Sequence, residues 1–151
     1  MGRHAEAHAE GGFTMLELII VIMILGVVAA TTVPTIAKMT THSRVNQAVM
    51  VVAQDLQTVQ SNAARERKPM RITRGVDKKS FTVTDRASGT TYLTRNLGSG
   101  DAYSLDSISF STTPVDVFPN GFTSSALTLT LWAGGYSRQV TMSLVGWVRT
   151  K

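Results

Sequence analysis

A run of 16 residues without a charge, Leu18–Val33, constrains the fold of this chain more than any other feature. Together with the five residues before it, the run forms an apolar segment of 21 residues, Phe13–Val33. As a helix this segment is about 30 Å long, which is enough to cross a bilayer. It contains one acid, Glu17, whose burial in lipid is unfavourable. The sequence therefore predicts a transmembrane helix over residues 13–33 and leaves the role of Glu17 to be explained.

The apolar segment has two ordinary interpretations. One is a secretory signal peptide that is cut after the small residues Val28–Ala30. Against this, the 12 residues before the segment carry two acids and only one arginine, and helical patterning continues beyond the cut. The other is a plain membrane anchor, which explains the length of the segment but not the presence of Glu17.

A third interpretation places a cleavage site between Gly12 and Phe13. Cleavage there leaves a new α-amino group on Phe13, four residues before Glu17. Burying a carboxylate costs less free energy when an ammonium group pairs with it, and an adjacent copy of the same helix can supply that group. Glu17 would then align one subunit with the next in an assembly, and residues 1–12 would be a leader peptide that is removed.

The motif GFTMLEL, followed by the apolar run, resembles the class III signal of type IV pilins and type II secretion pseudopilins. Gly12 matches the glycine before the cut, Phe13 the first mature residue and Glu17 the fifth, while Gly26 and Pro34 match a glycine and a proline common in that helix. The resemblance implies that a prepilin peptidase cleaves after Gly12 and methylates the new N-terminus, giving N-methylphenylalanine. It also implies a single-pass protein of the bacterial inner membrane, with the rest of the chain on the periplasmic side.

Residues 34–68 are predicted to continue the helix as an amphipathic segment. Apolar side chains recur at helical spacing at Val45, Val49, Val52, Leu56, Val59 and Ala63. The opposite face holds Arg44, Asn46, Gln47, Gln54, Asp55 and Gln57. Pro34 is expected to kink the helix, and residues 35–41 are expected to be irregular because they are poor in strong helix formers. Two separate helices are the alternative, and the last turn is expected near Lys68-Pro69.

Residues 69–151 are predicted to form an antiparallel β head domain, because the hydrophobic period changes from 3.6 to 2. Apolar side chains alternate with polar ones at Phe81 and Val83, at Ile108 and Phe110, at Leu127, Leu129 and Leu131, and at Val140, Met142 and Leu144. Gly134-Gly135 separates the last two sets and predicts a β-hairpin. The expected fold class is α+β, with the long helix packing its apolar stripe on an antiparallel sheet.

The residues that carry catalytic chemistry form no recognisable constellation. Two of the three histidines, His4 and His8, lie in the expected leader, and His42 stands alone. The chain has no cysteine, so thiolate metal sites and disulfides are excluded. Asp101 and Asp106 are two acids without the loop pattern of a calcium site. The sequence therefore predicts a protein that is not an enzyme and that has neither a cofactor nor a metal site.

The C-terminal portion, VFPNGFTSSALTLTLWAGGYSRQVTMSLVGWVRTK, resembles the GspH/FimT subfamily of minor pilins and pseudopilins. In that subfamily a phenylalanine and an NG-like turn precede two long strands, a small residue and a basic tail. This resemblance implies a minor structural subunit of a type II secretion pseudopilus or a type IV pilus. Its expected partners are the membrane, the prepilin peptidase and the other pilin or pseudopilin subunits of the filament.

Two other functions stay open. One is a DNA-binding minor pilin for DNA uptake. The cations Arg138, Arg149 and Lys151 could contact phosphate, and the aromatic rings of Trp132, Tyr136 and Trp147 could stack on bases. Some FimT-like pilins bind DNA through a tail of the form Gly-Arg-x-Arg, but Trp147 stands where the first arginine is expected, which argues against DNA. The other is a membrane-tethered domain that never assembles.

Overall fold

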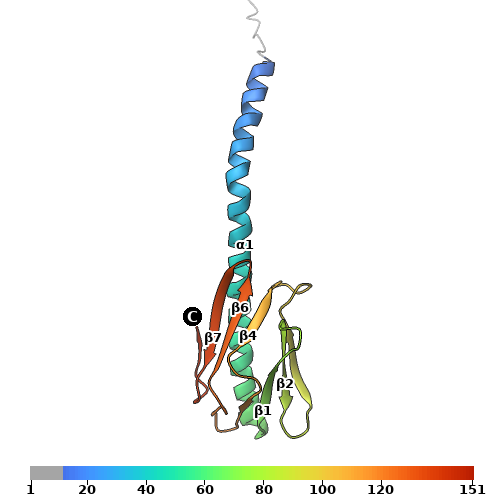
Figure 1. The fold of residues 1–151 in the computed structure, drawn as a ribbon, viewed down its shortest axis with the longest axis vertical. Helices are drawn as coiled ribbons and strands as arrows, with labels where there is room; N and C mark the ends of the chain where they lie inside the picture. Colours follow the sequence, from blue (N-terminus) through green and yellow to red (C-terminus); the bar gives the residue numbers. More distant parts are fainter. Residues whose placement is uncertain (1–11) are drawn as a thin grey trace, which may run out of the picture. The chain divides into compact units, whose positions relative to one another are not determined.

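The computed structural model describes residues 12–151. One helix, α1 (Met15–Glu66), is followed by eight strands: β1 (Met70–Arg74), β2 (Ser80–Asp85), β3 (Thr91–Asn96), β4 (Ser107–Phe110), β5 (Val115–Val117), β6 (Leu127–Ala133), β7 (Tyr136–Met142) and β8 (Val148–Thr150). The chain divides into two compact units, one that ends at Ala37 and one formed by Lys38–Lys151, which we call the head. Figure 1 shows the strands gathered along the part of α1 that belongs to the head.

Helix α1 is a single element of 52 residues that contains Pro34. It runs through residues 35–41, so the irregular segment expected there, and the alternative of two separate helices, are wrong. The hydroxyl of Thr31 donates to the carbonyl of Val28 at 3.0 Å, and that of Thr35 to the carbonyl of Thr31 at 3.2 Å. Such bonds are compatible with a helical backbone, and helix propensity is only a weak determinant. A kink at Pro34 stays a prediction.

The apolar stripe of α1 lies at the centre of the core of the head. All six of its residues are buried, each with 3% or less of its surface exposed: Val45, Val49, Val52, Leu56, Val59 and Ala63. The prediction of this stripe is confirmed. Asp55, which the sequence pattern assigned to the polar face, is also buried, so that assignment is wrong. The physical reason is a partner on β3, described below.

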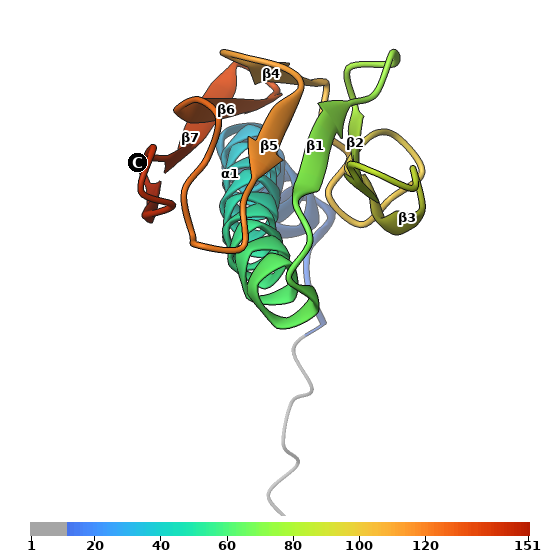
Figure 2. The same ribbon diagram turned by 90° about the horizontal axis from the view of Figure 1, so that it is seen from below.

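The strands form two four-stranded antiparallel sheets, where the sequence predicted one. The first has the order β3-β2-β1-β5 and the second the order β4-β6-β7-β8. The inward side chains of both sheets join the stripe of α1 in one hydrophobic core. Seen from below in Figure 2, the two sheets lie around one side of α1. The α+β fold is therefore confirmed, and the opposite side of α1 within the head is exposed.

The hairpin of β6 and β7 forms as the sequence predicted. Its two-residue turn consists of Gly134 and Gly135, with φ angles of 54° and 80°. Glycine adopts such angles at no steric cost, and a turn of this kind matches the twist of the two strands. The predicted continuation of β7 to Leu144 is wrong: β7 ends at Met142, and Leu144 is 53% exposed. The chain turns there because the N–H of Gly146 donates to the carbonyl of Ser143 at 2.9 Å.

Candidate functional site

The expected cleavage site lies directly before α1. Gly12 and Phe13 are outside any helix or strand, and Phe13 is 83% exposed. A Cβ atom added to Gly12 would meet nothing within 4 Å. Among residues 12–151 nothing therefore crowds the Gly12 side of this bond. The rest of the expected leader, residues 1–11 with His4 and His8, lies outside the described residues.

Thr14 caps the N-terminus of α1. Its hydroxyl accepts a hydrogen bond from the backbone N–H of Glu17 at 3.2 Å, and its carbonyl accepts one from the N–H of Leu18 at 3.2 Å. Glu17 stands in the first turn, where a negative charge is favourable next to the helix dipole. This cap was not predicted from the sequence, although a threonine followed three residues later by a glutamate is its usual signal. Glu17 thus contributes to the start of the helix through its backbone N–H and its charge, while its side chain is exposed.

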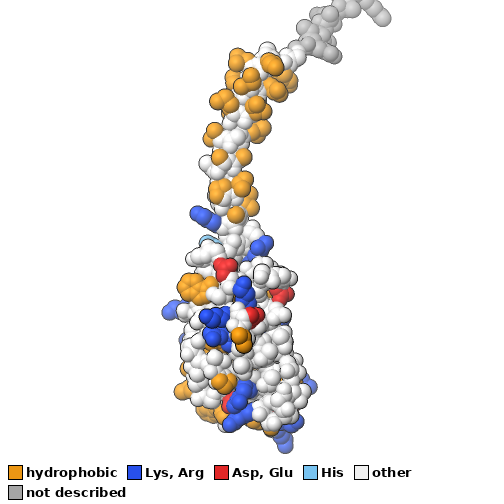
Figure 3. Space-filling model, turned by 45° about the vertical axis from the view of Figure 1, so that its right-hand side comes forward, with side chains coloured by type: hydrophobic (Ala, Val, Ile, Leu, Met, Phe, Trp, Pro, Cys, Tyr) orange, Lys and Arg blue, Asp and Glu red, His pale blue; other side chains and the backbone are white. Residues whose placement is uncertain are grey.

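The helix after Glu17 has the surface of a membrane span. Its most apolar stretch has a mean hydropathy of 2.6 and is 0% buried, so length and composition allow it to cross a membrane. Figure 3 shows hydrophobic side chains on its visible surface before the head begins. The hydroxyls of Thr31 and Thr32 both donate to the carbonyl of Val28, so they are satisfied without water. A helix that is apolar on all sides requires lipid or neighbouring helices around it.

A buried ion pair connects α1 to β3 in the head. Nε of Arg95 donates to Asp55 at 2.7 Å, and Nη2 donates to its other carboxylate oxygen at 2.8 Å. The side chains of Asp55 and Arg95 are 10% and 30% exposed. This hydrogen bonding raises the pKa of the Arg95 guanidinium above its ordinary value. The pair could not be predicted from the sequence, because the two residues lie on elements that only the tertiary fold brings together.

A second link between α1 and β3 involves Tyr92. Its hydroxyl donates a hydrogen bond to the carboxylate of Glu66, and this raises the pKa of Tyr92 to about 12. The register of β2 and β3 shifts beside Tyr92, between Val83 and Thr84. A β-bulge of this kind re-aims a side chain, which explains how Tyr92 and Arg95 can both reach α1. Strand β3 is thus held to the helix at two points.

Residues 65–86, at and after the end of α1, are rich in lysine and arginine, and part of this basic segment stabilises the fold. Arg71 donates two hydrogen bonds to Asp116, at 2.7 and 3.1 Å, and Arg86 lies 3.4 Å from the same carboxylate. The hydrogen bonds from Arg71 hold the pKa of Asp116 below its ordinary value. Asp85 is 2% exposed, accepts hydrogen bonds from the turn that follows it and lies 3.6 Å from Lys68. Several cations of this segment are therefore engaged within the head.

The structure brings the three expected DNA-contacting residues together on β7, β8 and the C-terminus. Nε of Arg138 donates to the carbonyl of Lys151 at 3.1 Å. The guanidinium of Arg149 lies 4.2 Å from the centre of the Trp147 ring, a cation–π contact. Trp147 itself is 65% exposed. On the face shown in Figure 3, lysine and arginine side chains are spread over the head and do not form one stripe.

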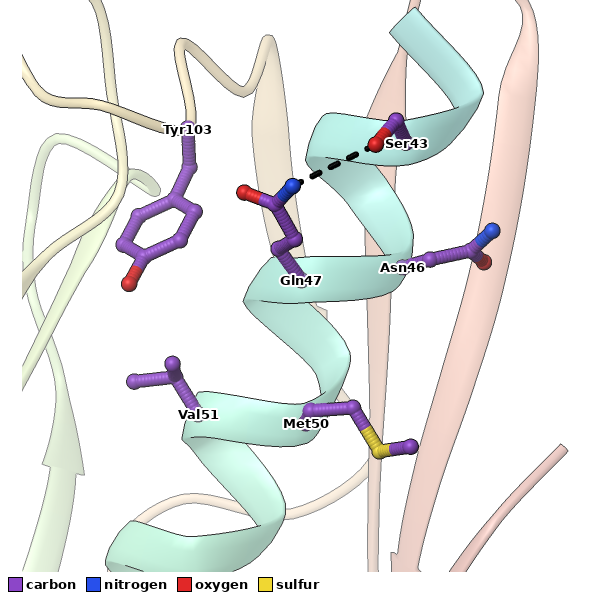
Figure 4. A pocket seen from close by; sticks show the side chains of 6 residues that line it. All are labelled: Ser43, Asn46, Gln47, Met50, Val51 and Tyr103. Atoms are coloured by element: carbon purple, nitrogen blue, oxygen red, sulfur yellow. Dashed lines mark hydrogen bonds between the residues drawn. The ribbon is translucent and has the colours of Figure 1, made fainter. Parts of the chain in front are cut away.

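One hollow of about 630 Å³ lies between α1 and the loop that carries Tyr103. In Figure 4, Tyr103 faces the side of α1 that carries Gln47 and Val51, and Gln47 donates to the hydroxyl of Ser43 at 3.3 Å. Its lining contains no carboxylate, histidine or cysteine, so the hydroxyls of Ser43 and Tyr103 have no general base beside them within the hollow. Asp106, one of the two acids considered for calcium, accepts a hydrogen bond from the N–H of Gly134 at 2.8 Å. Among the described residues no group of three potential metal ligands is found.

Comparison with known proteins finds two matching families. The family described as type II transport protein GspH matches residues 48–146, and the prokaryotic N-terminal methylation motif matches residues 8–33. No curated protein matches the chain. The type IV minor pilin FimU of Pseudomonas aeruginosa has a similar structure, with a TM-score of 0.60 and 19% identity over 73% of this chain and 90% of FimU. The minor pseudopilin EpsH from the type 2 secretion system of Vibrio cholerae gives a TM-score of 0.59 and 16% identity over 72% of this chain and 96% of EpsH. At these identities both likenesses show the fold.

Proposed function

Because the chain belongs to the GspH family of type II transport proteins, it is a structural subunit of a type II secretion pseudopilus or a type IV pilus, and we propose that it enters this filament through its N-terminal helix. The observation that supports this most strongly is the state of that helix. Its apolar side chains are exposed on all sides in the single chain. Lipid covers such a surface before assembly, and the helices of neighbouring subunits cover it afterwards.

We propose that a prepilin peptidase cuts the chain between Gly12 and Phe13 and methylates the α-amino group of Phe13. The methylation motif supports this, because it spans the expected cleavage site. The open position of Gly12 before the cap at Thr14 supports it too, since the cut would not disturb α1. The new ammonium group would then pair with Glu17 of an adjacent subunit and lower the cost of burying its carboxylate.

We also propose that the anchor lies in the inner membrane and that the head lies on the periplasmic side. The head lies outside the apolar anchor segment, and it has a complete hydrophobic core of its own. It would therefore present the surface that is specific to this subunit. A hollow of about 450 Å³ in the head is lined by Asp77, Lys79, Ser99 and Asp101, but Asp77 accepts hydrogen bonds from the N–H of Lys79 and the hydroxyl of Ser80 and so holds the turn, which fits a structural role.

Assembly is tested with the full chain and its partner subunits. A single cysteine placed on the exposed anchor helix, for example at Leu18 or Ile22, and a cysteine placed on the anchor helix of a partner subunit should form a disulfide crosslink in sheared filament fractions when an oxidant is added. Cysteine at Thr130, which lies on β6 in the head, serves as a control for nonspecific crosslinking. A chain that stays wholly in the membrane fraction and never crosslinks to another subunit would contradict the proposal and favour a tethered domain.

A further inference from the structure

Strand β8 presents unused backbone groups at the edge of the second sheet. The sheet order β4-β6-β7-β8 leaves β8 with one neighbour only. Gln139 of the β7 strand and Lys151 exchange two hydrogen bonds, at 2.9 and 2.8 Å. In antiparallel pairs the bonded residues alternate, so the N–H and C=O groups of Val148 and Thr150 point away from β7. No hydrogen bond from these four groups to any other residue of the described chain is found.

A groove lies beside this edge. It has a volume of about 790 Å³ and runs between β8 and the exposed side of α1. Its lining includes Met50, Gln54 and Gln57 from the helix and Val148, Arg149 and Thr150 from the strand. Met50 is 67% exposed and gives the groove an apolar side chain on its helix side. The one charged residue in the lining is Arg149, and no acid lines the groove.

We propose that this groove binds an extended segment of a neighbouring filament subunit, which adds to β8 as a further strand. The proposal rests on the assembly proposed above. An added strand would satisfy the free groups of Val148 and Thr150. Because side chains of a strand alternate, those facing α1 would be apolar and contact Met50, and those on the other side would be acidic and pair with Arg149. The expected segment therefore alternates apolar and acidic residues.

Two other occupants fit the edge less well. A second copy of this chain that paired through its own β8 would bring Arg149 and Lys151 close to the same cations of its partner, and like charges across a strand pair are destabilising. Nucleic acid could contact Arg149, but its phosphate groups only accept hydrogen bonds. Phosphate would therefore pair with the N–H groups of Val148 and Thr150 but not with their carbonyls. A peptide backbone supplies both donors and acceptors.

The direct test is residue-resolved hydrogen exchange on the full chain in detergent micelles, with a synthetic peptide of alternating valine and glutamate as the probe. The exchange rates of the Val148 and Thr150 amides should fall by up to about tenfold when the peptide is bound, since each amide gains a hydrogen bond. The amide of Lys151 already donates to Gln139 and should change little. A peptide of alternating valine and lysine is the matched control and should give no protection. Uniform protection, or none, would overturn the proposal.

The same measurement distinguishes the proposed segment from a second copy of this chain and from nucleic acid. If Val148 and Thr150 are protected without peptide at high protein concentration, and a dimer is seen, the edge binds a second copy and the proposal is overturned. If duplex DNA protects these amides and displaces the acidic peptide, the groove is a nucleic-acid site and the proposal is likewise overturned.

Two variants at one position separate the backbone contribution from the side chain. Thr150→Pro removes a donor that β7 does not use, so β8 should stay paired and the melting temperature should stay close to that of the parent. Affinity for the acidic peptide should fall about tenfold, whereas Thr150→Val should bind as the parent does. Arg149→Gln should weaken the acidic peptide by about tenfold as well. Unchanged affinity in a folded Thr150→Pro variant would refute strand addition.

Strand addition at β8 and assembly into filaments can fail independently, and the experiments distinguish the two failures. The parent chain's entry into filaments tests the assembly by itself. If the parent assembles and Thr150→Pro assembles equally well and keeps its peptide affinity, only the strand-addition proposal falls.

Discussion

Arg95 holds Asp55 through two parallel hydrogen bonds, of 2.7 and 2.8 Å, so that a strand of the first sheet is fastened to the helix at a buried carboxylate. Removing one member leaves the other charge poorly solvated. We expect Asp55→Ala to destabilise the head by about 2–3 kcal/mol, because the site is buried but not fully dry. Thermal unfolding of the full chain in detergent, followed by near-UV circular dichroism, measures this. Gln54→Ala, one position earlier and exposed, is the control and should change stability little.

Processing should occur between Gly12 and Phe13. Mass spectrometry of the mature chain should find an N-methylated Phe13 at the N-terminus, because the cut lies in an open segment before the helix cap. Gly12→Leu should block the cut. Gly26→Ala should leave it unchanged, since a Cβ atom at Gly26 meets nothing within 4 Å. A mature chain that starts at Thr31 would show that signal peptidase cuts instead.

Glu17→Ala should leave membrane insertion intact or improve it, while incorporation into filaments falls. The reason is that the change removes a charge that lipid disfavours but that the assembly is proposed to use. The ratio of filament-associated to membrane-associated protein measures the effect. Thr14→Ala is the informative control, because it removes the cap without removing the carboxylate. If both variants lose assembly equally, Glu17 acts through the start of the helix and not between subunits.

DNA binding should be weak or absent near physiological salt. The side chain of Arg138 is tied to the carbonyl of Lys151, and Arg149 stacks on Trp147, which stands where an arginine was expected. Fluorescence anisotropy with duplex DNA at several salt concentrations tests this. For a phosphate-binding tail, the pair of changes Arg149→Ala and Lys151→Ala would weaken all sequences alike and reduce the salt slope by about 1 per lost contact. Submicromolar affinity that disappears in this double variant would establish a DNA-binding role.

Acid should destabilise the head through Asp116 and Asp85. Both carboxyls have a pKa below the ordinary value, because Arg71 donates to the first and backbone N–H groups donate to the second. A carboxyl whose pKa is lower in the folded state stabilises it above the unfolded pKa of about 4 and loses that contribution as the pH falls through the folded pKa. The melting temperature should therefore fall progressively below about pH 4. Asp116→Asn should flatten this dependence, and a parent curve that stays flat down to pH 2 would contradict the assignment.

The sequence predicted what local spacing encodes. The stripe from Val45 to Ala63 follows the helical period, and the turn at Gly134-Gly135 follows from residues that accept positive φ angles. The processing motif is equally local, and the cap at Thr14 could have been predicted from the same residues.

Features that depend on distant partners were not predicted. Asp55 is buried only because Arg95, 40 residues later, reaches it. The strands divide into two sheets because β5 pairs with β1 in the first sheet and β4 pairs with β6 in the second, and the local sequence does not encode either long-range pairing. Leu144 continued an alternating pattern, but the turn closed by Gly146 took it out of the strand. In each case tertiary contacts overrode a local pattern.

The position of the buried stripe along the chain affects how the head folds. Residues 45–63 are synthesised first, yet the strands that cover them include β6 and β7, which end at Met142. Distant segments must meet before such a core closes, and folds that depend on non-local strand pairing fold slowly, on a scale of milliseconds to seconds. Translation adds about 5–20 residues per second, so the stripe waits several seconds before its last strand has been made. During that interval the apolar side chains of an already anchored helix are exposed, and a holding chaperone or an early partner on the same side of the membrane would protect them from aggregation.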